Sequence, residues 1–199
     1  MLLSLASLTG LIAGLWIIAG VALAGRFYAN YSHTQQLCSE LGAAGSPTEK
    51  LSPVINNYPL AILFCLFGFY VLDHSSTLLV SAIGWCVIAH GIGTLVAGYF
   101  PMDADPYTEH PSRSCNIHTI AGIVMLLSLL VAPVLVFFTA VPLSFKLFSA
   151  LCLVLFLLFT GMMAQEYNKR GKIGLYQRLS YGAQLLWLAG YSLLLNQAL

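Results

Sequence analysis

Six long apolar stretches, joined by short polar connections, constrain this chain more than any other feature of its sequence. A helix needs about 20 mostly apolar residues to cross the hydrocarbon core of a bilayer, which is about 30 Å thick. The stretches that meet this requirement run approximately over residues 3–24, 54–72, 78–100, 117–138, 143–163 and 179–195. They do not alternate with a period of two residues, which disfavours a β-barrel. We therefore predict an all-α, polytopic transmembrane helical bundle with six transmembrane helices.

The composition agrees with a membrane location. Charged residues make up only 8% of the chain, against about 25% in soluble domains, so too little polar surface is left to face water. The formal net charge is +1, which gives no electrostatic footprint for nucleic acid. We expect residues 1–199 to form a single integral membrane domain, with membrane lipids as its surroundings and partners.

The basic residues are distributed unevenly between the two sides of the predicted membrane protein. The first, third and fifth connections and their flanks carry seven of the eight basic residues, namely Arg26, Lys50, Arg113, Lys169, Arg170, Lys172 and Arg178. The positive-inside rule predicts that this side is cytoplasmic. A competing signal is that Cys38 and Cys115 lie on the same side, where a disulfide between them would need an oxidising compartment.

The same side also carries most of the chain's acidic and histidine residues. Asp103 follows the third apolar stretch and His118 opens the fourth, so both are expected at one membrane boundary. They could form a hydrogen-bonded structural pair, or two ligands of a metal such as zinc, with Asp105 and His110 completing the site. The spacing matches no known metal motif, so both alternatives stay open.

Three further polar residues are candidates for a site or for structural contacts. His90 lies ten residues before Phe100, which is about 15 Å into the membrane at 1.5 Å per residue. An ionisable group at that depth is a functional candidate; the alternative is a neutral histidine bonded to a neighbouring backbone or hydroxyl group. Glu166 and Arg178, which flank the last connection, are expected to form an interhelical ion pair.

Four short motifs follow one another along the chain. They are Ser39-Glu40-Leu41-Gly42, Val54-Ile55-Asn56-Asn57, Gly98-Tyr99-Phe100-Pro101-Met102-Asp103 and Ile117-His118. In this order and spacing they resemble the domain-of-unknown-function family 998, over nearly the whole chain. The resemblance implies a six-helix membrane protein of bacterial or archaeal origin, hence of a prokaryotic inner membrane, and implies no established activity. Glu40 stands where the family usually has aspartate, which keeps the carboxylate.

Two classes of function fit these residues. The first is a non-enzymatic role, in which the chain binds lipid or belongs to a membrane complex. The alternative is a metal-dependent intramembrane hydrolase acting on a lipid, with catalytic candidates Ser39, Glu40, Asp103 and His118 and with zinc polarising the scissile carbonyl. Asn57 and Arg178 are supporting candidates in either case. Haem ligation by His90 and His118 is disfavoured because their depths do not match.

Overall fold

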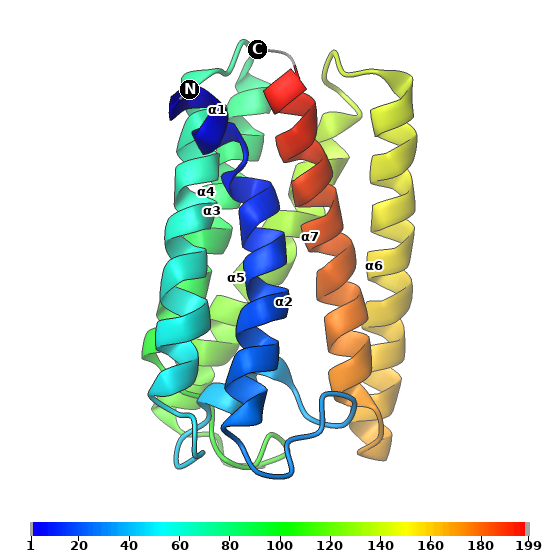
Figure 1. The fold of residues 1–199 in the computed structure, drawn as a ribbon. Coiled ribbons are helices and arrows are strands. Elements are labelled where there is room, and N and C mark those ends of the chain that lie inside the picture. Colours follow the sequence, from blue (N-terminus) through cyan, green and yellow to red (C-terminus); the bar gives the residue numbers. More distant parts are fainter. Residues whose placement is uncertain (1, 198–199) are drawn as a thin grey trace.

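The computed structural model describes residues 2–197, which form a bundle of long helices that run up and down in turn (Figure 1). The α-helices are α1 (Leu2–Ser7), α2 (Thr9–Arg26), α3 (Tyr58–Asp73), α4 (Leu78–Tyr99), α5 (Arg113–Val136), α6 (Leu143–Lys169) and α7 (Ile173–Gln197). Two short helical turns, η1 (Cys38–Gly42) and η2 (Pro53–Asn57), lie in and after the first connection. No strand occurs in the described range, so the predicted all-α membrane bundle is confirmed.

Five helical segments are long and apolar enough to cross a membrane. They are Thr9–Arg26, Pro53–Asp73, Leu78–Tyr99, Arg113–Val136 and Leu143–Lys169. The sixth predicted span corresponds to α7, which is 25 residues long but is not among these five. Its polar residues Ser180, Gln184 and Ser192 are nearly completely buried. They lower the hydropathy of the segment although they face protein.

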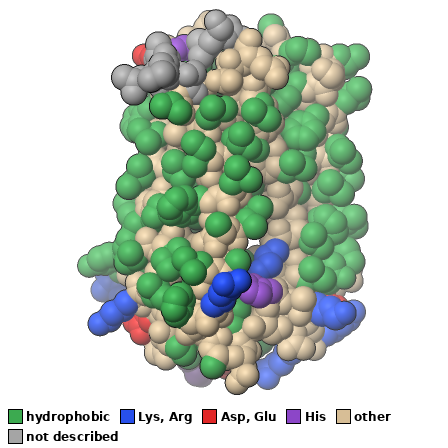
Figure 2. Space-filling model, viewed as in Figure 1, with side chains coloured by type: hydrophobic (Ala, Val, Ile, Leu, Met, Phe, Trp, Pro, Cys, Tyr) green, Lys and Arg blue, Asp and Glu red, His purple; other side chains and the backbone are tan. Residues whose placement is uncertain are grey.

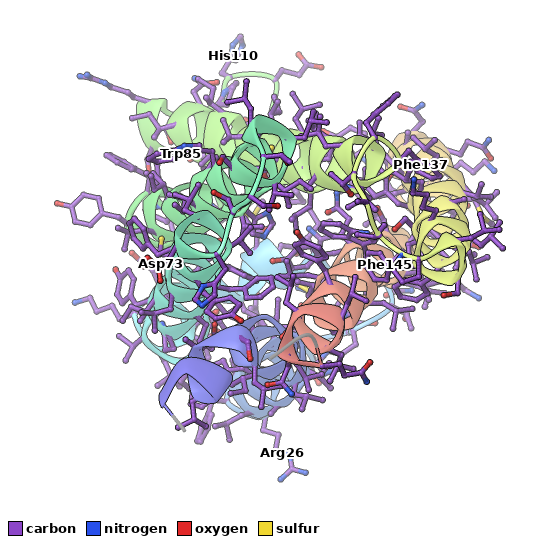
Figure 3. All side chains as sticks on the ribbon, turned by 90° about the horizontal axis from the view of Figure 1, so that it is seen from above. Arg26, Asp73, Trp85, His110, Phe137 and Phe145 are labelled. Carbon is purple, nitrogen blue, oxygen red and sulfur yellow. The ribbon has the colours of Figure 1, made fainter. Side chains whose placement is uncertain are left out.

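The long helices form a closed ring in the order α2, α3, α4, α5, α6, α7. Seen down the bundle, α6 stands at the edge of the ring beside α7, with side chains pointing into the interior (Figure 3). Contact between α5 and α6 is sparse compared with that between α6 and α7. Helices that are neighbours in the ring are therefore consecutive in the sequence. The exception is the pair α7 and α2, whose contact closes the ring.

The two ends of the bundle differ in character. Both termini lie at one end, and the other end carries the connections 27–52, 100–112 and 170–172 (Figure 1); we call it the polar end. Apolar side chains cover the height of the bundle in Figure 2, while the visible lysine and arginine side chains gather at the polar end. This distribution matches the uneven spread of basic residues along the sequence.

The start of the second span is irregular because of a proline. Pro59 has no N–H, so it cannot donate to the carbonyl of Ile55 four residues earlier. The indole Nε1–H of Trp16, on α2, donates to this carbonyl at 2.8 Å instead. Ile55 lies in the π-helical turn η2, so the hydrogen bond from the indole ties this turn to α2.

Glycines allow α3 and α4 to approach closely. A Cβ on Gly98 would lie 2.5 Å from the Cβ of Asn57, and one on Gly84 would lie 3.0 Å from the carbonyl oxygen of Gly68. Small residues at such positions let helices pack backbone to backbone in a bilayer, where van der Waals contact replaces the hydrophobic driving force.

The terminal half of the bundle is filled by aromatic side chains. Trp187 and Tyr191 of α7 stack with ring centroids 5.4 Å apart, and Phe67 meets Tyr191 edge-on at 6.2 Å. Trp187 is fully buried and its Nε1–H donates to Ser149 Oγ at 3.0 Å. The open space inside the bundle therefore lies toward the polar end.

Candidate ligand-binding site

A cavity of about 320 Å³ lies inside the ring; we call it the central cavity. All six long helices contribute to its wall, together with η1 and η2. Among the described residues that line it, none is Asp, Glu, Lys or Arg. Its polar groups are instead hydroxyls, carboxamides and histidine rings, including those of Thr94, Asn56, Gln184 and His118. The cavity can therefore receive an uncharged polar group without burying an unpaired charge.

His90 bridges three helices at the wall of the central cavity. Its side chain is fully buried. Its Nδ1 lies 2.9 Å from the carbonyl oxygen of Met125 on α5, and its Nε2 lies 2.9 Å from the hydroxyl of Tyr181 on α7. A neutral ring satisfies both contacts, because Nδ1–H donates to the carbonyl and Nε2 accepts from the tyrosine. These contacts are the ones expected for a histidine bonded to a neighbouring backbone or hydroxyl group, while a functional role of His90 stays a prediction.

His118 joins the end of α4 to the start of α5. Its Nδ1 donates to two carbonyl oxygens, those of Ala97 at 3.0 Å and Phe100 at 2.9 Å. The last carbonyls of a helix have no intrahelical partner, so the imidazole supplies the missing donor. The His118 ring also lines the central cavity.

Asp103 does not bond to His118, so the hydrogen-bonded pair, one of the two alternatives left open by the sequence, is not formed. The Asp103 carboxylate accepts from the backbone N–H of Ser112 at 2.7 Å. Hydrogen bonding from the Ser112 side chain, followed by this backbone bond, holds the pKa of Asp103 below its usual value. The carboxylate thereby fixes the connection that leads into α5.

The remaining metal candidates lie apart from the cavity. Asp105 accepts from the backbone N–H of Tyr107 within the same loop, and His110 is exposed. Across residues 2–197, no group of three or more His, Cys, Asp and Glu side chains is placed so that it could hold a metal ion. Zinc binding by Asp103, Asp105, His110 and His118 stays a prediction from the sequence.

The first connection covers the central cavity at the polar end. The backbone N–H of Cys38 donates to Gln177 Oε1 at 2.7 Å, and that of Leu175 donates to the carbonyl of Thr34 at 2.9 Å. Ser39 and Gly42, in η1, line the cavity beneath. Burial raises the pKa of the Cys38 thiol, against the opposing charge of Arg178. These contacts hold η1 against the start of α7.

Glu40 stabilises the first connection and does not line the central cavity. One carboxylate oxygen accepts from the backbone N–H of Leu37 at 2.7 Å, and the other accepts from Gln36 Nε2 at 3.1 Å. The side chain is only 9% exposed. Its role in the structure is thus to hold the turn that precedes η1.

Cys38 and Cys115 are both free thiols, so the disulfide considered from the sequence is not formed.

A second hollow, of about 570 Å³, lies between α2 and α7; we call it the lateral groove. Leu15, Ile18 and Leu186 line it and are more than half exposed, so the groove opens on the outer surface of the bundle. Figure 2 faces this side, where basic and histidine side chains gather below the apolar surface. From Leu11 to Ala22 the groove follows α2 for about 16 Å at 1.5 Å per residue.

The two hollows adjoin each other. Four residues line both, namely Ile17, Val21, Cys38 and Tyr181. Tyr181 stands between them, with its hydroxyl bonded to His90 as described above. A molecule that entered the groove from the bilayer would lie directly beside the neutral polar wall of the central cavity.

Arg178 lies at the polar end of the lateral groove. Its Nη1 donates to the carbonyls of Gln36 at 2.8 Å and Gly174 at 2.9 Å, and its Nη2 donates to the hydroxyl of Tyr31 at 2.6 Å. The neighbouring His33 also lines the groove. Partial desolvation, followed by the charge of Arg178, lowers the pKa of His33, which is otherwise exposed. Burial raises the pKa of Tyr31 above its usual value.

The expected ion pair between Glu166 and Arg178 is wrong. The Glu166 carboxylate accepts from the backbone N–H of Lys172 at 2.7 Å and lies 3.8 Å from the Nζ of Lys169. Arg170 takes a left-handed conformation, φ 50°, which turns the chain sharply after α6. Glu166 is thereby used to close the turn between α6 and α7.

One carboxamide oxygen on the cavity wall is buried without a hydrogen-bond partner. Asn56 Oδ1 accepts no hydrogen bond and faces Gly20 of α2, where an added Cβ would clash with it. The oxygen therefore packs against α2. Gln184, also on the wall, donates from Nε2 to the carbonyl of Leu126 at 2.9 Å.

The sequence candidates therefore divide into two groups. Ser39, Asn57, His90 and His118 line the central cavity, and Arg178 lines the lateral groove. Glu40, Asp103 and Glu166 hold connections at the polar end through backbone hydrogen bonds. Sequence reasoning missed Tyr181 and Gln184, although two polar residues inside an apolar stretch are a usable signal.

Comparison with known proteins identifies one family. The model of the family described as "Protein of unknown function (DUF998)" matches residues 11–194. This range takes in α2 to α7 almost completely, and with them every residue that lines the two hollows. No curated protein and no solved structure matches the chain.

Proposed function

The chain belongs to the DUF998 family of proteins of unknown function, and we propose from its own site that it binds a membrane lipid. In this proposal an acyl chain lies in the lateral groove, and the uncharged polar region of the lipid reaches the central cavity. The observation that carries the proposal is that an apolar hollow open to the bilayer adjoins a neutral, hydrogen-bonding cavity. The sequence fits lipid binding or a role in a membrane complex, and this arrangement supports the former.

The size and lining of the two hollows fit such a ligand. Ligand sites are typically about 300–1,000 Å³, mostly apolar, with a few polar groups that fix orientation. The central cavity and the groove, at about 320 and 570 Å³, both fall in this range. The groove's length of about 16 Å at 1.5 Å per residue is roughly half the 30 Å hydrocarbon core. A chain from a single leaflet would therefore span it.

Three glycines provide matched probes of this proposal. A Cβ added at Gly182, Gly122 or Gly161 would meet no atom within 4 Å, so a side chain at each position begins in open space. Gly182 lines the lateral groove, Gly122 lines the central cavity, and Gly161 lines neither. All three lie inside helices, where replacing glycine gains helix propensity. Differences in lipid binding among the variants would therefore not reflect lost stability.

The experiment is native mass spectrometry of the protein released from nanodiscs of defined lipid composition. We expect lipid adducts on the wild type and on Gly161→Leu, at least tenfold fewer on Gly182→Leu, and a smaller loss on Gly122→Leu. Equal retention of lipid by Gly182→Leu and Gly161→Leu would show that the groove is not the binding place.

We also propose that α7 is a sixth span and that the polar end faces the cytoplasm of a prokaryotic cell. At 25 residues and 1.5 Å per residue, α7 is about 37 Å long, enough to cross the bilayer. An even number of spans agrees with both termini lying at one end (Figure 1). The seven basic residues at the opposite, polar end support a cytoplasmic orientation of that end.

A C-terminal alkaline phosphatase fusion would then be active, whereas a C-terminal green fluorescent protein fusion would be dark; the reverse pattern would refute this topology.

A further inference from the structure

We infer that the lipid bound in the lateral groove carries an anionic headgroup, which Arg178 recognises at the polar end of the groove. This inference rests on the proposed function and adds the chemical class of the ligand. The occupant is a lipid of the bilayer leaflet at the polar end, and not a water-soluble anion, because the apolar groove continues from the guanidinium. The evidence lies in the charge, hydrogen bonds and position of this one side chain.

Arg178 carries a charge that no carboxylate balances. In the described chain, the ion pairs are those of His74 with Asp73 and of Lys169 with Glu166, and Arg178 forms none. Its acceptors are two backbone carbonyls, a tyrosine hydroxyl and a histidine nitrogen, all of them neutral. A charge taken out of water normally has an ionic partner, because its desolvation is otherwise uncompensated. A ligand anion would supply that partner.

The carboxylate of Glu40 is already engaged elsewhere. Glu40 lies in η1, which packs against α7, but its oxygens bond to Leu37 N–H and Gln36 Nε2. Gln36 stands between the two charges, since its carbonyl accepts from Arg178 Nη1 at 2.8 Å. The protein therefore uses its local carboxylate to shape the loop and leaves the guanidinium without a counter-charge.

One edge of the guanidinium is only partly used. Nε is buried and has no hydrogen-bond partner. Nη2, which shares this edge, makes a short bond to Tyr31 and a long one, 3.4 Å, to His33 Nδ1. Nε–H and Nη2–H form the parallel pair of donors that matches two oxygens of a carboxylate or phosphate. His33 is exposed, so its weak contact is the one that an anion would replace.

The position of Arg178 fits the headgroup of a lipid whose chain fills the groove. Arg178 and His33 line the polar end, while Leu11 and Ala189 line the other end. An anion bound to the guanidinium would therefore continue into apolar surface along α2 and α7. The shared chemistry of the candidate headgroups is a phosphate or carboxylate at the end of a hydrocarbon chain.

A pair of lipids that differ only by a phosphate tests the inference on the unaltered protein. Oleoyl lysophosphatidic acid and mono-oleoylglycerol share one acyl chain and one glycerol. We expect the wild-type protein in neutral nanodiscs to bind the phosphate-bearing lipid about tenfold more tightly, as one charge-assisted hydrogen bond predicts. Raising the salt concentration should reduce this preference. Free glycerol phosphate should bind far more weakly than either lipid.

Variants then assign the preference to one side chain. Arg178→Gln should abolish the preference for the phosphate, and Arg178→Lys should reduce it, because lysine keeps the charge but loses the paired donors. Arg26→Gln is the matched control, since Arg26 also lies at the polar end but points away from the bundle (Figure 3). It should leave the preference unchanged.

The outcomes separate this inference from the proposed function. If neither lipid binds, both the proposed function and the inference fail. Equal binding of the two lipids by the wild type would overturn the anionic headgroup and leave lipid binding intact. If free glycerol phosphate binds as tightly as the lipid, the site takes a soluble anion and the inference fails. Because the lipid pair is compared on the wild-type protein, a failure of Arg178→Gln to fold would not remove the test.

Discussion

Replacing His118 by alanine should destabilise the protein by about 1–2 kcal/mol. The imidazole Nδ1–H donates to two carbonyl oxygens at the end of α4, at 3.0 and 2.9 Å. A hydrogen bond contributes about 1 kcal/mol net, and carbonyls left without a donor in a partly buried place cost about as much. For a chain of about 200 residues, each 1 kcal/mol lowers Tm by about 2–4 °C. The expected decrease in Tm is therefore about 2–8 °C.

The assay is thermal unfolding in detergent, followed by a dye that reacts with newly exposed thiols. Cys152 is only 2% exposed in the folded protein, so its labelling reports unfolding. His118→Asn should recover at least half of the loss, because an asparagine side-chain amide can donate from nearly the same place. His110→Ala is the control, since His110 is exposed on the same connection and surface substitutions usually stay within about 0.5 kcal/mol. Equal Tm values for His118→Ala and His110→Ala would refute the clasp between α4 and α5.

Three further predictions concern other contacts of the bundle. Tyr181→Phe removes the hydroxyl that bonds to His90 at 2.9 Å and should lower stability by about 0.5–1.5 kcal/mol, the range for interhelical hydrogen bonds in membranes; no change in an SDS unfolding titration would contradict this. Gly98→Ala places a Cβ 2.5 Å from that of Asn57 and should cost about 1–3 kcal/mol by overpacking, measured in the same titration. Because the pKa of Asp103 is lowered in the fold, its stabilisation is complete above the ordinary aspartate pKa of about 3.9 and is lost as the pH falls through the lower folded value. The stability of the wild type relative to Asp103→Asn should accordingly decline in acid, and a constant difference between pH 7 and pH 3 would count against the reasoning.

The helical architecture was predictable because the signal is local. The composition of each apolar stretch alone predicts a helix, and five segments are long and apolar enough to cross a membrane. The helix ends were harder to predict, since α6 continues to Lys169 and α7 begins at Ile173, beyond the apolar residues. The π-helical start of the second span depends on Trp16 donating to the Ile55 carbonyl, a contact between helices that hydropathy does not contain.

The candidate site was predictable only in part. His118 was identified from its position at the start of an apolar stretch, and Ser39 from the short motif that contains it; both line the central cavity. The lateral groove was not predicted, because it lies between the first and last long helices, which meet only when the ring closes. The predicted partner of Arg178 was wrong because opposite charges near one boundary do not determine which backbone groups each side chain reaches.

The position of bound lipid tests the central claim most directly. A lipid with a photoreactive group along its acyl chain can be cross-linked to the protein in nanodiscs and the labelled residues identified by peptide mass spectrometry. We predict labelling concentrated on the outward residues of the groove, Leu15, Ile18 and Leu186, and reduced by Gly182→Leu. The comparison surface is Leu147, Leu151 and Val154 on α6, which are also more than half exposed but line neither hollow. Equal labelling of the two surfaces would contradict a lipid-binding groove between α2 and α7.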